Sequence, residues 1–256
     1  MARVHLMYAS AIAYHQRMHA APVTPDPGPR PTLLAWSGGK DCLLALARLR
    51  TDPHWQVKAL LTTVNRSHQR IAMHGVRRDI LHAQAAALGL PLLEVAIDWP
   101  GSNADYEAAH ATALVEARRR WPGIRHCAFG DLFLEDIRDY RVRQLGMENW
   151  RAVFPLWGED TAALARRFLA EGHRAMLCCV DTTQLAAEFC GRAYDAQLLD
   201  DLPADVDPCG ERGEFHTLSY ASPLFAAPLQ LRRGESVLRD GRFQFTDFML
   251  RAEAAR

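Results

Sequence analysis

The feature that most constrains the fold of this chain is a short apolar run followed at once by two glycines and a leucine-rich segment. Residues 33–36 read LLAW, residues 37–42 read SGGKDC, and leucine and alanine then recur at helical spacing to residue 49. This pattern is typical of a buried strand, a tight turn and a helix. Glycines let the backbone approach an oxyanion, the new helix presents its positive end, and Lys40 adds a mobile charge. The segment therefore predicts a phosphate-binding turn.

The spacing within this turn excludes two commoner phosphate-binding loops. A Walker A loop needs four residues between its first glycine and its Gly-Lys pair, and the dinucleotide fingerprint needs G-x-G-x-x-G; residues 37–42 match neither. The alternative is a plain glycine turn with Lys40 and Asp41 in solvent. Lysine is scarce in the chain, at Lys40 and Lys58 alone, so its position beside two glycines favours a phosphate site.

From residue 32 the sequence alternates between strand and helix patterns. Strands are predicted at residues 32–36, 57–63, 92–97 and 126–129, and helices at 41–50, 76–88, 103–120 and 134–146. This order predicts an α/β fold with a doubly wound parallel sheet, whose ligands bind at the carboxyl ends of the strands. We therefore expect the turn at residue 37, the segment 62–75 and the pair Gly130 and Asp131 to surround one cleft.

Composition shifts divide the chain into three parts. Five prolines between residues 22 and 31 indicate a weakly ordered extension over residues 1–31, and the α/β domain is assigned to 32–149. A smaller α+β domain is assigned to 150–256, with helices at 161–171 and 183–190 and a strand at 173–180. Residues 235–250 predict a hairpin that turns at 239–241, with Phe243, Phe245 and Phe248 on its apolar face.

Charge and cysteine usage limit the partners of the protein. The 256 residues contain 30 acidic and 30 basic side chains, so no overall field favours nucleic acid. The six cysteines form no C-x-x-C pair, which argues against a zinc ribbon and favours free thiols in a reducing cytoplasm. No apolar run reaches the roughly 18 residues needed to span a bilayer. These features predict a soluble, cytoplasmic protein without a membrane partner, and they leave the oligomeric state open, with a homodimer as one option.

A second informative stretch covers residues 208–217, which read PCGERGEFHT. Glu211 and Glu214 could bind Mg²⁺, orient an amine or accept a proton, and the glycines would let the backbone approach a ligand. On composition alone, a tight turn with solvated acids that leads into a strand is an equally good interpretation.

Five motifs in register resemble one family. SGGKDC, FGD at 129–131, RDYRVR at 138–143, PLW at 155–157 and CGERGEFHT at 209–217 occur in the order found in the diphthine–ammonia ligase family. These proteins belong to the pyrophosphate-loop ATP pyrophosphatases, whose signature is SGGKDS, so Cys42 stands where serine is usual and puts one phosphate contact in question. The resemblance implies an adenine nucleotide alpha hydrolase domain followed by a smaller carboxyl-terminal domain.

The resemblance also implies a reaction and a set of site residues. ATP would adenylate a carboxylate with release of pyrophosphate, and ammonia would then displace AMP to leave an amide. Lys40, Glu211 and Glu214 would be catalytic, with Glu214 receiving the proton of the amine. Mg²⁺ would enter with ATP, and Asp41 would either contact the ion or only favour the start of the helix. The expected nucleotide-binding residues are Ser37, Gly38, Gly39, Lys40, Asp41, Cys42, His74, Gly75 and Asp131.

The acceptor and two other functions stay open. The acceptor carboxylate could belong to a small molecule or a protein. Scarce lysine beside abundant arginine and alanine indicates a GC-rich, bacterial genome, where the modified histidine of elongation factor 2 that the family amidates would be missing. One alternative function is a nucleotide-binding sensor without turnover, which the Cys42 departure allows. The other is a tRNA-modifying ATP pyrophosphatase, against which the neutral charge and the lack of a cysteine pair count.

Overall fold

The computed structural model describes residues 28–67, 70–71, 75–98 and 102–251. Its first part is an α/β unit built from ten elements, which are, in chain order, β1 (Arg30–Ala35), α2 (Lys40–Thr51), β2 (Trp55–Asn65), β3 (Arg70–Ile71), α3 (Arg78–Leu88), β4 (Leu92–Ile97), α4 (Asn103–Arg120), β5 (His126–Ala128), α5 (Glu135–Met147) and β6 (Arg151–Val153). The four strands and four helices predicted for this part are present, with bounds that differ by a few residues at most.

Sheet A is six-stranded and almost entirely parallel. β4, β2, β1, β5 and β6 lie side by side in parallel, and short β3 pairs antiparallel with the end of β2. The chain runs from β1 toward β4 in one direction and from β5 toward β6 in the other, so the order reverses between β1 and β5. In doubly wound sheets, ligands bind at such a reversal, outside the carboxyl ends of the strands. β6 also carries sheet A past residue 149, where the sequence analysis ended this domain.

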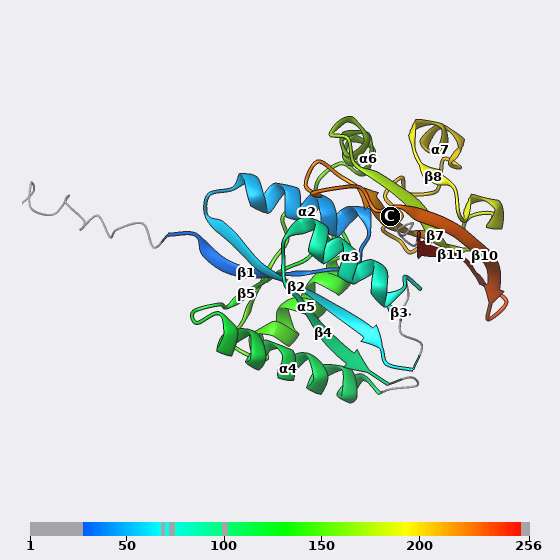
Figure 1. The fold of residues 1–256 in the computed structure, drawn as a ribbon. Coiled ribbons are helices and arrows are strands. Elements are labelled where there is room, and N and C mark those ends of the chain that lie inside the picture. Colours follow the sequence, from blue (N-terminus) through cyan, green and yellow to red (C-terminus); the bar gives the residue numbers. More distant parts are fainter. Residues whose placement is uncertain (1–27, 68–69, 72–74, 99–101, 252–256) are drawn as a thin grey trace, which may run out of the picture.

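Helices cover both faces of sheet A (Figure 1). Alternate residues of each strand point to opposite faces. Leu33, Leu61 and Cys127 therefore pack with α4, whereas Leu34 and Leu60 pack with α2 and α3. Of the residues in α2, seven are buried, which explains why the leucine-rich segment forms a helix that is anchored on the sheet.

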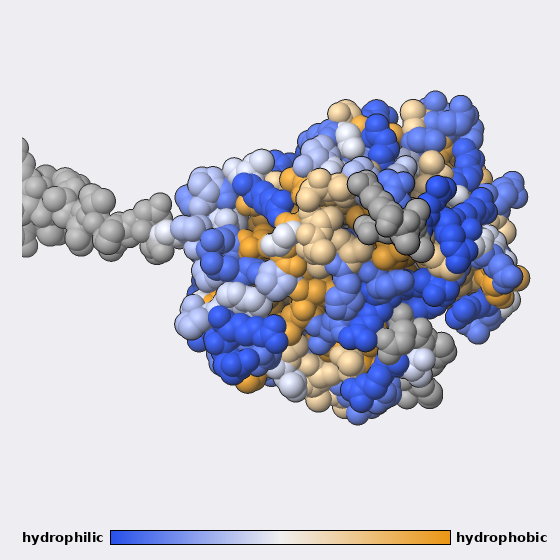
Figure 2. All heavy atoms as spheres, in the orientation of Figure 1, coloured by the Kyte–Doolittle hydropathy of each residue, from blue (hydrophilic) through white to orange (hydrophobic). Residues whose placement is uncertain are grey.

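The second part of the chain builds a five-stranded antiparallel sheet, sheet B. Its elements are α6 (Thr161–Ala170), β7 (Arg174–Asp181), the 3-10 helix η1 (Ala187–Phe189), β8 (Ala193–Tyr194), α7 (Ala196–Asp201), β9 (Phe215–Ala221), β10 (Leu231–Arg239) and β11 (Phe243–Leu250). β7 pairs with β8, β9 and β11, and β11 pairs with β10. The core on the α2 and α3 side of sheet A continues into sheet B through Leu177, Phe215 and Leu218. On the face shown in Figure 2, hydrophilic residues are interspersed with apolar ones. Val115 of α4 and Val237 and Leu238 of β10 are exposed apolar side chains.

Two predictions for this part were wrong. Residues 183–190 form a turn and η1 instead of an α-helix, because the Asp181 carboxylate accepts hydrogen bonds from the backbone and hydroxyl of Thr183 and from Gln184. Such local side-chain bonds compete with helix formation. The hairpin formed as predicted, but its three phenylalanines do not share one face. Phe248 is buried with Thr246, and Phe245 lies on the opposite face, against Gly75.

Among the described residues, no helix is both long and apolar enough to cross a bilayer.

Candidate functional site

A cleft of about 430 Å³ opens where the chain order of sheet A reverses. That volume is in the range of about 300–1,000 Å³ that small-molecule sites occupy. The carboxyl ends of β1, β2 and β5 contribute Ser37, Thr62 and Asp131. Strand β9 of sheet B contributes Thr217, and the loop before β9 contributes Glu211. The two motifs that the sequence singled out therefore meet in one cleft.

The glycine turn after β1 has the geometry of an anion site. Gly38 has φ +81°, and a Cβ there would lie 2.8 Å from Oε1 of Gln84, so the turn requires glycine. Helix α2 begins at Lys40 after Gly39, which has no side chain to cap it, and the N–H of Lys40 donates to the hydroxyl of Thr217. The amino end of a helix carries a partial positive charge, and its remaining N–H groups can donate to anions. The turn therefore has a geometry that suits phosphate, and phosphate binding there stays a prediction.

Lys40 is held in place, and is not the mobile charge expected from the sequence. Its side chain is 1% exposed, and Nζ lies 2.7 and 2.8 Å from the two carboxylate oxygens of Asp41. Nζ also donates to the backbone carbonyl of Cys209. Burial opposes the charge on Lys40, but the surrounding acidic groups, with Asp41 the foremost, together raise the pKa of the ammonium group. Lys40 is thus a fixed positive charge at the base of the cleft.

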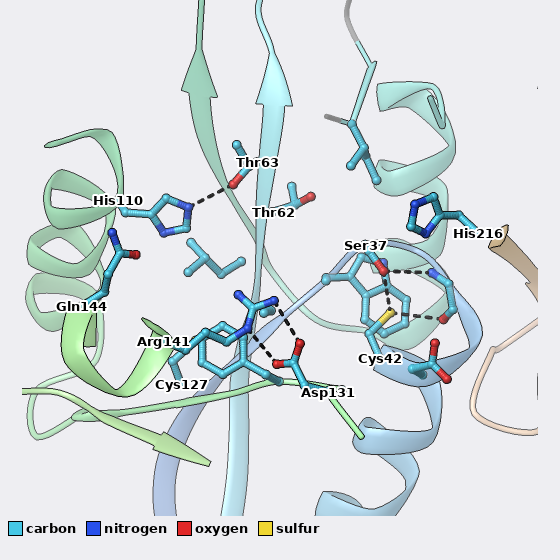
Figure 3. Close-up of a pocket in the computed structure, with 18 of the residues that line it drawn as sticks. Ser37, Cys42, Thr62, Thr63, His110, Cys127, Asp131, Arg141, Gln144 and His216 are labelled. Carbon is cyan, nitrogen blue, oxygen red and sulfur yellow. Dashed lines mark hydrogen bonds and ion pairs between the residues drawn. The ribbon is translucent and has the colours of Figure 1, made fainter. Parts of the chain in front are cut away.

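The thiol of Cys42 makes hydrogen bonds within the glycine turn and is not a reactive thiolate. Sγ donates to the carbonyl of Gly39 at 3.1 Å, and the hydroxyl of Ser37 lies 3.6 Å from the same sulfur (Figure 3). Burial raises the pKa of Cys42 to about 11, so the thiol stays protonated at neutral pH. Cysteine in place of the usual serine at residue 42 therefore still supplies a hydrogen bond within the turn.

Of the two glutamates expected to be catalytic, Glu211 is the one that lines the cleft. Its Oε1 accepts a hydrogen bond from the backbone N–H of Leu132 at 2.7 Å, which fixes the side chain beside the end of β5. Burial raises the pKa of Glu211 to about 7, and the charges of Asp41 and Asp131 act in the same direction. A carboxylate that titrates near neutral pH is suited to accept and return a proton.

Glu214 does not join the cleft. It is 2% exposed and does not line the cleft, and its Oε1 accepts a hydrogen bond from the backbone N–H of Asp207 at 2.9 Å. Asp207 in turn holds the N–H of Cys209 and the hydroxyl of Thr161. The position of Glu214 therefore does not support the expected proton transfer to it. Its side chain instead belongs to the hydrogen bonds around Asp207 that hold the loop before β9.

The side of the cleft opposite the glycine turn comes from α4 and α5. The guanidinium of Arg141 pairs with Asp131, with Nε 2.7 Å from Oδ2, and lies 4.3 Å from the centre of the Phe129 ring. His110 lies 3.0 Å from the hydroxyl of Thr63, and burial lowers its pKa to about 4, so its imidazole is neutral (Figure 3). This wall combines the ion pair of Arg141 and Asp131 with hydrogen-bonding groups such as His110 and with the carboxylate of Glu107.

The remaining expected residues have mixed outcomes. Gly38 and Gly75 do not line the cleft; Gly75 packs against Phe245 of β11, and His74 falls outside the described residues. Gly130 does line it, and a Cβ there would lie 2.8 Å from the backbone carbon of Asp41. No group of three or more His, Cys, Asp or Glu side chains in the described ranges could hold a metal ion.

Three residues that the sequence analysis did not assign complete the site. Thr217 Oγ1 accepts the backbone N–H of Lys40 at 3.0 Å, and Gln84 makes hydrogen bonds to the glycine turn. Thr62 has a buried hydroxyl that lines the cleft and has no hydrogen-bond partner among the described residues. Buried polar groups are normally paired, so this hydroxyl fits a polar ligand atom. Gln84 had a signal in the sequence, because it is polar at a position where the spacing of α3 predicts the buried face.

Comparison with known proteins agrees with this arrangement. The family profile for the diphthamide synthase N-terminal domain matches residues 31–140, and that for the diphthamide synthase C-terminal domain matches residues 160–245. A search of curated proteins finds no match. The two matched segments contain the glycine turn and the loop that carries Glu211, which are the two halves of the cleft. The chain therefore belongs to the diphthamide synthase family, also called the diphthine–ammonia ligase family, whose members use ATP.

Proposed function

We propose that this protein is an ATP-dependent ligase that adenylates a carboxylate, releases pyrophosphate, and forms an amide when ammonia displaces AMP. The observation that carries the proposal is that the glycine turn at the start of α2, the buried ammonium of Lys40 and the near-neutral carboxyl of Glu211 face one cleft. A phosphate site alone would suit many proteins, but a proton acceptor beside it suits attack by an amine.

Each part of the cleft has a role in this reaction. The N–H groups at the glycine turn and the charge of Lys40 stabilise the negative charge that moves onto pyrophosphate as the bond to the α-phosphorus breaks. Holding the two substrates in one orientation supplies a further part of the rate. The unpaired hydroxyl of Thr62 is available to a polar atom of the nucleotide.

Glu211 serves as the general base in the second step. Ammonia that attacks an acyl adenylate becomes positively charged, and it must lose a proton before AMP leaves with the electron pair of the broken C–O bond. A carboxylate with a pKa of about 7 can accept that proton at neutral pH. Glu211 therefore takes the role that the sequence analysis gave to Glu214.

Mg²⁺ would enter bound to ATP. This cation commonly binds to phosphate oxygens with only one or two protein carboxylates and keeps several waters. Asp41 fits as that carboxylate, because it lies at the start of α2 and lines the cleft. Lys40 holds both oxygens of Asp41, so the carboxylate would have to share one with the ion.

One observation favours a second candidate, a nucleotide-binding sensor without turnover. Lys40 donates to Asp41 and to the carbonyl of Cys209, and Cys42 directs its thiol to the carbonyl of Gly39. Both groups thus make contacts within the protein. Such a module would bind ATP at the glycine turn and release no AMP.

The test measures AMP and pyrophosphate after incubation with Mg²⁺-ATP, ammonium and a panel of carboxylates. The ligase predicts AMP and pyrophosphate in equal amounts, dependent on one class of carboxylate, and loss of about 10²-fold or more in Lys40→Ala, the cost typical of removing a group that stabilises developing charge. ATP binding without turnover for any carboxylate would favour the sensor. Glu214→Gln should leave ATP affinity within about twofold, because its side chain does not line the cleft.

A further inference from the structure

Gln84 lies directly beneath the glycine turn and is fully buried, with 0% of its surface exposed. Its Nε2 donates to the carbonyl of Gly38 at 3.0 Å and to the carbonyl of Ser219 at 2.7 Å. Its Oε1 accepts the indole N–H of Trp36 at 2.9 Å. One side chain of α3 thus joins the end of β1, the glycine turn and β9, and it uses both of its amide hydrogens.

These contacts fix the orientation of one peptide group. The carbonyl of Gly38 accepts a second hydrogen bond, from the backbone N–H of Ser219 at 2.8 Å. In a planar trans peptide the carbonyl and the following N–H point in opposite directions. Because the carbonyl of Gly38 points to Gln84 and Ser219, the N–H of Gly39 points the other way.

That other direction leads to the cleft. Gly39 and Ser37 line the cleft, whereas Gly38 does not. The N–H of Gly39 is directed at the hydroxyl of Ser37, at a long distance of 3.4 Å. A bond of that length is weak, so an anion in the cleft can compete for the same N–H.

We propose that Gln84 is a positioning residue that keeps the Gly38–Gly39 peptide from flipping, so that its N–H and not its carbonyl oxygen faces the phosphate groups. The proposal rests on the proposed function, because it concerns the same phosphate site. A peptide between two glycines can rotate at little steric cost, since neither residue has a Cβ. Without the hydrogen bond from Gln84, the carbonyl oxygen of Gly38 would face a negatively charged ligand for part of the time. The site would then lose the N–H of Gly39 as a donor and gain a repulsive dipole.

The chemistry of glutamine matches this task. Two hydrogen-bond donors and one acceptor are required at the site, and a carboxamide supplies them without a charge. A buried methionine has a similar length and no donor. A buried carboxylate would set its oxygens against the carbonyls of Gly38 and Ser219.

The experiment compares Gln84→Met with Leu88→Ala. Leu88 is buried in the last turn of the same helix and does not line the cleft, so its loss lowers stability without touching the peptide. Calorimetry measures the affinity of each variant for Mg²⁺-ATP and for inorganic pyrophosphate. We expect about tenfold weaker binding of both ligands to Gln84→Met, the upper end of what one hydrogen bond contributes. Leu88→Ala should bind both within about twofold of wild type, although its melting temperature falls.

Each result decides a different question. Equal ligand affinities in Gln84→Met and wild type would overturn the proposed role of Gln84. An equal loss of affinity in Leu88→Ala would overturn it as well. Wild-type protein with no affinity for either ligand would instead overturn the proposed function.

Amide NMR of the wild-type protein gives a readout that does not depend on how the variant folds. The proposal predicts that pyrophosphate shifts the amide resonance of Gly39, as a new hydrogen bond to an oxyanion should. An unshifted Gly39 resonance at saturating pyrophosphate would contradict it.

Discussion

The backbone N–H of Lys40, at the start of α2, donates to the side-chain hydroxyl of Thr217 on β9 at 3.0 Å. A second bond joins β9 to the turn that precedes α2, from the N–H of Ser219 to the carbonyl of Gly38 at 2.8 Å. The glycine turn of sheet A is therefore attached to sheet B through its backbone. The second part of the chain does more than border the cleft, because its hydrogen bonds also hold the glycine turn in place.

Replacing Thr217 by valine should weaken both the fold and the turn. The variant keeps the shape of the side chain but leaves the N–H of Lys40 without its acceptor, so we expect the free energy of unfolding to fall by about 1–3 kcal/mol. The KM for ATP should rise as the first turn of α2 loosens. Urea denaturation and steady-state kinetics measure the two effects. Thr217→Ser keeps the hydroxyl and is the control; equal behaviour of the two variants would contradict this account.

The rate of amide formation should depend on the ionisation of Glu211. At a fixed concentration of free ammonia, we expect kcat to rise through pH about 7, because the carboxylate form accepts the proton. Glu211→Gln should lower kcat by about 10²-fold or more and remove the inflection, as expected for loss of a general base. The pH profile of kcat in both proteins tests this. An inflection that persists in the variant would assign it to another group.

The same substitution should stabilise the protein above neutral pH. The pKa of Glu211 is raised in the folded protein, from its ordinary value of 4.5 to about 7, so the fold disfavours the ionised form. Stability is therefore lost as the pH rises from about 4.5 to about 7, and the full cost applies above that range. At pH 8 we expect Glu211→Gln to raise the free energy of unfolding by about 1–3 kcal/mol, with partial exposure of the side chain taken into account. Urea denaturation at pH 4 and pH 8 checks the sign, and a larger gain at pH 4 would contradict it.

Gly130 should tolerate no side chain. A Cβ at this position would lie 2.8 Å from the backbone carbon of Asp41 and 2.9 Å from the nitrogen of Cys42, so α2 or the end of β5 would have to move. We expect Gly130→Ala to cost about 1–3 kcal/mol of stability, as overpacking does. Gly146→Ala is the matched control, because Gly146 lies in α5 with no atom near its Cβ position; alanine should be neutral or stabilise by up to about 1 kcal/mol there. Thermal unfolding of both variants measures the difference.

The sequence predicted the parts of the site that depend on local pattern. Glycines followed by a helix pattern located the turn at Gly38, and the βαβα order placed Asp131 at the same edge of the sheet. The parallel sheet and both of its helical layers followed from hydrophobic spacing alone.

The sequence could not choose between Glu211 and Glu214, because both lie in the same glycine-rich loop. Their roles depend on long-range contacts: the N–H of Leu132 holds Glu211 at the cleft, and the N–H of Asp207 holds Glu214 away from it. The burial of Lys40 was missed for the same reason, since the groups that enclose it include Cys209, which is distant in the chain.

The most direct test of the central claim takes a carboxylate that increases AMP release, labels it with ¹⁸O, and follows the label by mass spectrometry. If this protein transfers adenylate to a carboxylate, one ¹⁸O from the acceptor must end in the phosphate of AMP, because the C–O bond breaks when ammonia attacks. The account predicts labelled AMP in step with amide. Unlabelled AMP, or ADP and phosphate in its place, would contradict it.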